Sequence, residues 1–175
     1  MKRTLSALTV AATLSLSVSA ANAEPLKIGI IESLSGPQAS TGRLYAAAAR
    51  YAFDKINKDG GFNGQPIEVV EYDNGGNTSD AAVRFRNTVS DGMHVLMMGA
   101  SSAVAGQISE DVRKHNMRNK GKEMMFINLG AQALELRGDR CHFHSFHLTT
   151  TAPMLVSSLV KVMDDEGALG KRVYA

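Results

Sequence analysis

Strand-like and helix-like segments alternate along this chain at intervals of about thirty residues, and this alternation restricts its possible folds more than any other feature. Four short apolar runs, rich in β-branched residues, end at turn residues as buried strands do. Between these runs, apolar side chains recur at helical spacing. The predicted strands cover residues 27–34, 66–72, 95–98 and 124–128, and the predicted helices cover 43–57, 78–91 and the segment from Ser101 or Ser102 to 116.

The predicted strands lack the polar alternation of a half-exposed sheet, which is typical of strands that are covered on both faces. Connections that contain a helix join parallel strands. The pattern therefore predicts an α/β protein in which a parallel sheet is flanked by helices.

The alternation changes after Leu129. A loop with Gly130 and Gly138 comes first, followed by a predicted strand over 143–148 and a predicted helix over 152–165. Residues 172–175 have the pattern of another strand, and the sequence stops there without a following element. We interpret the chain as an incomplete protein, with a short terminal edge strand as the alternative.

The first 23 residues have the three parts of an export signal. These are Lys2 and Arg3, an apolar run over 5–18, and the small-x-small motif that ends at Ala23. A membrane anchor is the alternative, but the run contains Ser and Thr and is shorter than the ~20 apolar residues of a membrane span. Cleavage after Ala23 is expected, and it would give a soluble periplasmic product with no membrane insertion.

The charge distribution gives no indication of a polyanionic partner. The sequence has 19 basic and 17 acidic side chains, and two of the basic ones, Lys2 and Arg3, lie in the export segment. The remainder is neutral, with its charges scattered rather than arranged in a stripe. This pattern argues against nucleic acid and against an anionic membrane surface as partners.

Ligands of parallel α/β sheets bind beyond the carboxyl ends of the strands. Four predicted loops lie there, at 35–42, 74–78, 99–103 and 130–133. The third is the most informative, because Ser101 and Ser102 place hydroxyls beside the free N–H groups of a helix start, an arrangement that suits a carboxylate or a phosphate. A simple helix cap is the alternative interpretation of either serine.

Motifs for catalysis or for a cofactor are absent from the sequence. The chain has no dinucleotide fingerprint, no Walker A pattern, no Gly-x-Ser-x-Gly elbow and no His-Glu-x-x-His helix. Asp54, Asp59 and residues 164–166 lie on or after helices and are interpreted as solvated charges. We therefore assign no catalytic residue and no cofactor.

Cys141, His142, His144 and His147 place four possible metal ligands within seven residues. In an extended segment, His142 and His144 share one face while Cys141 and His147 point to the other, so at most two ligands converge locally. Ordinary polar packing is therefore favoured, and an exported metal-binding protein using His142 and His144 stays as an alternative. Cys141 is the only cysteine, so the chain has no internal disulfide.

Several motifs resemble the periplasmic solute-binding proteins of ABC transporters, specifically the leucine/isoleucine/valine-binding type. Residues 56–64 (INKDGGFNG) are similar to the family's Ile-Asn-x-x-Gly-Gly-Ile-Asn-Gly turn. Residues 34–37 (LSGP) resemble its first loop, and residues 130–136 (GAQALEL) resemble its Gly-Ala-Thr-Ala-Pro-Glu-Leu loop. The resemblance covers most of residues 25–175.

This resemblance implies a type I periplasmic binding protein lobe, here incomplete, and a non-enzymatic protein that captures an amino acid of branched-chain type or a related small polar solute for an ABC transporter permease. Residues 24–147 would form the first lobe, and 148–175 the crossover and the start of a second lobe. A sensory ligand-binding domain of the same fold is the alternative. The residues that match the family's ligand-binding positions are Ser101, Ser102, Ala103, Ala131 and Gln132.

The sequence differs from the family pattern in three respects, and one is the absence, at 74–77 and at Ser101, of the cysteine pair that some members carry. Gln132 replaces a threonine that binds a ligand oxygen in the family, and Thr41 stands where many members carry an aromatic residue. Because these two substitutions fall on loops that would face the ligand, the identity of that ligand stays open between aliphatic amino acids, amides, urea and aromatic acids.

Overall fold

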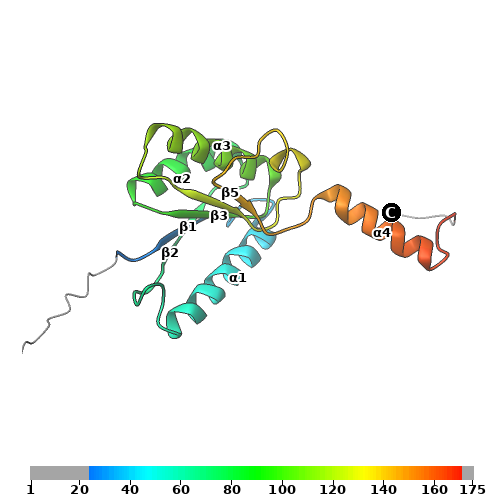
Figure 1. The fold of residues 1–175 in the computed structure, drawn as a ribbon, viewed down its shortest axis with the longest axis horizontal. Helices are drawn as coiled ribbons and strands as arrows, with labels where there is room; N and C mark the ends of the chain where they lie inside the picture. Colours follow the sequence, from blue (N-terminus) through cyan, green and yellow to red (C-terminus); the bar gives the residue numbers. More distant parts are fainter. Residues whose placement is uncertain (1–23, 171–175) are drawn as a thin grey trace, which may run out of the picture.

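The structure, a computed structural model, describes residues 24–170 and consists of a five-stranded parallel sheet with helices on both faces (Figure 1). The spatial strand order is β2-β1-β3-β4-β5. This arrangement confirms the predicted α/β class. The elements in chain order are β1 (Lys27–Glu32), α1 (Ala39–Lys58), β2 (Glu68–Asp73), α2 (Thr78–Ser90), β3 (Val95–Met98), α3 (Ser102–Arg118), β4 (Met125–Asn128), the short 3-10 helix η1 (Leu134–Leu136), β5 (Ser145–His147) and α4 (Ala152–Asp165).

The sheet is covered on both faces because successive side chains of its central strands enter two separate cores. Ile28 and Ile30 of β1 belong to the core beneath α1, whereas Ile31 belongs to the core beneath α2 and α3. Leu96 and Met98 of β3 also belong to the α2–α3 core. Figure 1 shows α1 on one side of the sheet and α2 and α3 on the other. The apolar runs that predicted buried strands thus supply both cores. The expectation of strands covered on both faces is wrong for β2, which lies at the edge of the sheet and has Tyr72 as its one buried residue.

Most predicted elements agree with the structure to within a few residues, and two differences affect the carboxyl edge of the sheet. Helix α1 begins at Ala39 instead of the predicted residue 43. The apolar periodicity begins only at Leu44, but the backbone bond from Gly42 N to Gln38 O (2.9 Å) already closes a helical turn there. The loop after β4 contains η1, which the sequence analysis did not predict.

Helix α4 differs from the other helices because none of its residues is buried. Apolar side chains such as Leu155, Leu159 and Val162 are exposed on it, and Figure 1 shows the helix projecting away from the sheet. No helix in the described part of the chain is both long and apolar enough to cross a membrane. The predicted export signal and the predicted strand at 172–175 lie outside the described residues.

Candidate functional site

The strand order places a switch point at the carboxyl edge of the sheet, and we call the region between the loops there the crevice. From β1 the chain crosses to β2 on one side, and it then returns to form β3 on the other side of β1. The loops that follow β1 and β3 therefore leave in opposite directions, and such a switch point is where open parallel sheets bind ligands. The loop after β4 lies beside them, because β4 pairs with β3. Three of the four predicted loops thus border this crevice directly.

The amino end of α3 forms one wall of this crevice. Ser101 is the N-cap of the helix, with extended backbone angles, and its Oγ accepts the N–H of Val104 at 3.5 Å. Ser102 and Ala103 form the first turn, where N–H groups have no partner within the helix. The Oγ of Ser102 accepts the N–H of Ala133 at 3.3 Å, which ties α3 to the loop after β4. Ala103 is exposed. Ser101 thus caps its helix, and the helix start still faces the crevice.

The loop after β4 is held by Asn128, a fully buried residue at the end of that strand. Its Oδ1 accepts the N–H groups of Gly130 and Ala131 at 3.1 and 2.7 Å, and its Nδ2 donates to Ala131 O at 2.7 Å. Both backbone groups of Ala131 are therefore occupied, and the residue is buried. The neighbouring Gln132 is half-buried and carries the polar side chain of this loop.

The loops after β1 and β2 are joined by buried Asn74 and half-buried Asp73. Asn74 Oδ1 accepts the hydroxyl of Ser33 at 3.0 Å and the N–H of Gly76 at 2.8 Å. Asp73 Oδ1 accepts the N–H groups of Leu34, Ser35 and Gly75 within 3.1 Å. Although burial acts to raise the pKa of Asp73, hydrogen bonding from the Ser35 side chain and from these backbone N–H groups holds it below its usual value.

Glu32, the last residue of β1, is fully buried beneath the crevice. Its Oε1 accepts the N–H of Gly99 in the loop after β3, and its Oε2 accepts the N–H of Ser33 at 3.2 Å. Burial raises the pKa of Glu32 to about 7, against the lowering effect of hydrogen bonds from Gly99, Ser33 and Ala100. A carboxyl group thus lies at the switch point itself.

Tyr45 of α1 packs against two glycines that border the crevice. A Cβ atom at Gly99 would lie 2.9 Å from the Tyr45 ring, and one at Gly130 would overlap the Tyr45 hydroxyl. Only glycine leaves room for this ring at both positions. The Tyr45 ring therefore contacts both the loop after β3 and the loop after β4.

Sequence reasoning found the loops but missed Glu32, Asp73 and Asn128 as the residues that shape them. A signal was available, because each of the three is the polar last residue of its strand. A polar side chain at that position reaches the loop backbones, which need partners wherever the loops are buried.

The four possible metal ligands near residue 141 do not converge. Among residues 24–170, no three His, Cys, Asp or Glu side chains gather as a metal site would require. His142 Nε2 lies 2.9 Å from Ser109 O, and His147 Nδ1 lies 3.0 Å from Asn128 Nδ2. Burial lowers the pKa of both imidazoles. These contacts correspond to the polar packing that the sequence analysis favoured.

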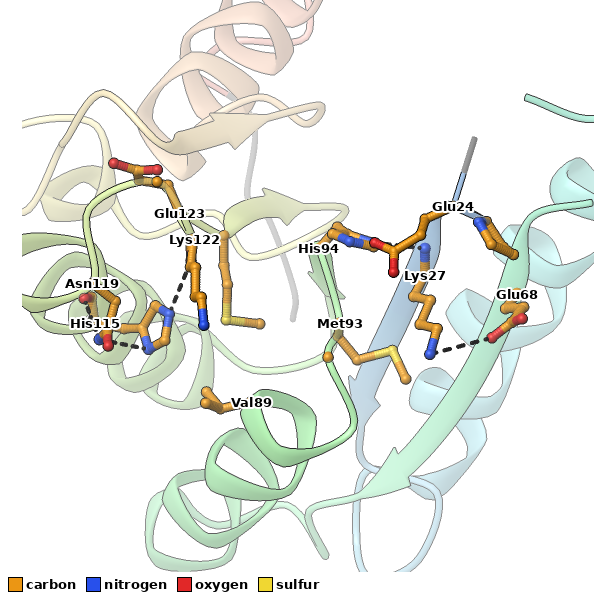
Figure 2. A pocket seen from close by; sticks show the side chains of 14 residues that line it. Glu24, Lys27, Glu68, Val89, Met93, His94, His115, Asn119, Lys122 and Glu123 are labelled. Carbon is orange, nitrogen blue, oxygen red and sulfur yellow. Dashed lines mark hydrogen bonds and ion pairs between the residues drawn. The ribbon is translucent and has the colours of Figure 1, made fainter. Parts of the chain in front are cut away.

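A cavity of about 820 Å³ lies at the opposite, amino edge of the sheet (Figure 2). Lys27 at the start of β1 and Glu68 at the start of β2 border it, with their charged atoms 3.9 Å apart. His94 precedes β3 and accepts the N–H of Lys27 at 3.0 Å. None of the predicted ligand-binding residues lines this cavity. The switch point and the helix start favour the carboxyl edge as the candidate site.

Comparison with known proteins agrees with this geometry. The profile of a family described as periplasmic binding protein matches residues 25–175. A relative from Brucella abortus, called Leu/Ile/Val-binding protein homolog 4, is 54% identical over 155 residues, which cover 89% of this chain and 37% of the relative.

Two solved structures are also similar. The leucine-, isoleucine-, valine-, threonine- and alanine-binding protein from Brucella ovis, in a closed conformation, matches with a TM-score of 0.81 and 54% identity over 86% of this chain and 38% of that one. A branched-chain amino acid transporter substrate-binding protein from Streptococcus pneumoniae, in complex with isoleucine, matches with a TM-score of 0.65 and 26% identity over 73% of this chain and 34% of that one. This chain therefore spans less than two fifths of the length of these relatives.

Proposed function

Because this chain belongs to the periplasmic binding protein family, we propose that it is the ligand-binding first lobe of an extracytoplasmic solute-binding component of an ABC transporter. The proposed ligand is an amino acid of branched-chain type or a related small polar solute, and the proposed partner is the transporter's permease. The names of the relatives support the ligand class, since one is called a homolog of a Leu/Ile/Val-binding protein and another is called a leucine-, isoleucine-, valine-, threonine- and alanine-binding protein. The proposed activity is binding, without catalysis.

The start of α3 at the switch point is the observation that carries this proposal. An α-helix has a partial positive charge at its amino end and N–H groups without partners there, so it can hold a carboxylate without Lys or Arg. We propose that Ser101, Ser102 and Ala103 receive the carboxylate of the amino acid. Ala131 and Gln132 would border it from the loop after β4, where the side chain of Gln132 offers the polar atoms.

The proposed division of the chain follows the burial pattern. We propose residues 1–23 as a signal peptide that directs the protein to the periplasm, 24–147 as the first lobe, and 148–175 as the crossover and the start of a second lobe. Leu148 N bonds to Asn128 O at 2.9 Å and Ala152 N to Gln132 O at 3.1 Å. The crossover is therefore attached to the end of β4 and to the loop after it. The exposed helix α4 begins where these contacts end.

The proposal is tested by titrating the chain with L-leucine at millimolar concentration while recording amide NMR signals. Binding is expected to be weak, because the lobe offers one wall of a site that normally surrounds most of its ligand. Saturable shifts are expected at Ser102 and Ala103. Shifts confined to the cavity at the amino edge, or no shift for any amino acid, amide or urea, would contradict the proposal.

A pair of variants separates the hydroxyl of Ser101 from its role as a helix cap. Ser101→Asn keeps a good N-cap but removes the hydroxyl, whereas Ser101→Ala removes both. If the hydroxyl holds the ligand, both variants weaken leucine binding about tenfold, the effect of one hydrogen bond to a charged group. Ser90→Ala, at the exposed end of α2, serves as the control and leaves binding unchanged.

A further inference from the structure

A buried carboxyl group lies directly beneath the proposed carboxylate site, and the proposed function makes no use of it. Glu32 is 0% exposed, and its two oxygens accept N–H groups from loops on either side of the crevice. Gly99, which donates to Oε1, stands two residues before the helix cap Ser101. The position of the helix start therefore depends on Glu32.

The charge of Glu32 has few neighbours to balance it. Among the described residues, no ion pair includes Glu32. Three charged side chains of the neighbouring elements bind the backbone of the loops around it, namely Asp73 at the end of β2, Arg43 on α1 and Arg84 on α2. Arg43 Nε donates to Leu34 O at 2.9 Å, and Arg84 Nε donates to Asp73 O at 2.8 Å, so both guanidinium groups bind backbone carbonyls. A charge on Glu32 would be compensated mainly by backbone N–H groups.

We propose that Glu32 is a positioning residue that makes ligand affinity depend on pH. It holds the loop of Gly99 in either protonation state. A carboxylate ligand binds most tightly when Glu32 is protonated. This inference rests on the proposed function. One oxygen of a protonated carboxyl still accepts the N–H of Gly99, so the loop keeps its place. An ionised Glu32 would instead repel the ligand carboxylate, and little water would lie between the two groups to screen the repulsion.

The sign of the effect follows from linkage. Since burial raises the pKa of Glu32 to about 7, the group changes charge near neutral pH. A bound carboxylate disfavours the ionised form, so it raises this pKa further and takes up a proton. Affinity is therefore highest below the pKa of the free protein and falls as pH rises through it. Asp73 stays ionised throughout this range, because its pKa lies below the usual value.

The test measures L-leucine affinity of the full chain at about pH 6 and about pH 8, a range in which free leucine stays a zwitterion. An acid of pKa near 7 changes its charge within this range. The wild type is expected to bind three- to tenfold more weakly at the higher pH, since a shift of one pKa unit corresponds to ~10-fold in affinity. Glu32→Gln keeps the acceptor for Gly99 and removes the charge, so its affinity is expected to be the same at both pH values. Glu68→Gln, the same change at the amino edge, is expected to keep the wild-type pH profile.

A second measurement needs no variant. Affinity and protonation are reciprocally linked, so saturating leucine must raise the pKa of Glu32, which the carboxyl ¹³C signal of that residue reports. An unchanged carboxyl pKa, or equal pH profiles for the wild type and Glu32→Gln, would overturn this inference while leaving the proposed function intact. Absence of leucine-induced shifts at the start of α3 in both proteins would overturn the proposed function as well.

Discussion

The polar side chains at the strand ends differ between the two edges of the sheet. At the carboxyl edge, Glu32, Asn74 and Asn128 are fully buried, and they bind the backbones of loops that the strands leave behind. At the amino edge, Lys27 and Glu68 lie beside an open cavity and form a loose ion pair (Figure 2). A buried polar group has to be satisfied by partners in fixed positions, whereas a solvated one can turn to water. The buried groups at the carboxyl edge therefore hold their loops in place, and the Lys27–Glu68 pair does not. At the amino edge this role falls to Asn57 and Asn116, which bind both backbone groups of Ile67 and of Met124.

Removal of the Asn128 side chain is expected to have the largest effect on this contrast. Asn128→Ala leaves two N–H groups and one carbonyl of the loop after β4 without their partners, and buried unsatisfied groups cost roughly 1–3 kcal/mol each. We expect the free energy of unfolding, from urea denaturation, to fall by roughly 3–4 kcal/mol. The matched control is Asn119→Ala at the exposed C-cap of α3, with an expected loss under ~1 kcal/mol. Equal losses for both variants would remove the distinction between a buried network and a surface asparagine.

A methyl group at Gly42 tests how closely the backbone packs at the same edge. A Cβ atom there would overlap Ser33 O, in the loop after β1, and a backbone atom cannot move aside as a flexible side chain can. Gly42→Ala is therefore expected to lower the free energy of unfolding by roughly 2 kcal/mol, even though alanine favours helix.

Gly106 in α3 provides the matched control for Gly42. An added Cβ at Gly106 would meet the end of the long Arg140 side chain, which can shift. Gly106→Ala should change the free energy of unfolding by less than ~1 kcal/mol, since the gain in helix propensity offsets the displaced side chain. Should Gly42→Ala prove as mild as Gly106→Ala, the loop after β1 would not be held tightly against α1.

The smallest effect is expected at the amino edge. Lys27→Met and Glu68→Gln, singly or together, should change the free energy of unfolding by less than ~0.5 kcal/mol, because partly exposed ion pairs contribute little. A double-mutant cycle in urea measures the coupling directly. A coupling energy above ~1 kcal/mol would show that this edge is also organised by its charges.

The sequence predicted the fold well because the signal for buried strands is local. Runs such as 95–98 contain only apolar side chains, and they need two cores to cover them, so the parallel sheet with helices on both faces follows. The start of α1 was missed because Gly42 and its neighbours carry no apolar periodicity. That turn is fixed by contact with Ser33, a residue on another element.

The candidate site was predictable in part. Ser101 was expected at a helix start, and the structure confirms that it is the N-cap of α3. Glu32 was not singled out, since a glutamate that ends a strand looks the same in sequence whether it is buried or solvated. Its burial and the rise of its pKa to about 7 come from the loop that closes over it.

The sequence by itself determined which segments become strands and helices, and hence the order in which loops reach the two edges of the sheet. Periodicity and turn residues suffice for this, because they act between neighbours along the chain. Only the tertiary structure decided that β3 lies beside β1 rather than beside β2, which places Glu32 under Gly99 and the start of α3 at the switch point. The reason is physical: burial, charge compensation and close packing depend on residues that are distant in sequence, and they exist only once the sheet is assembled.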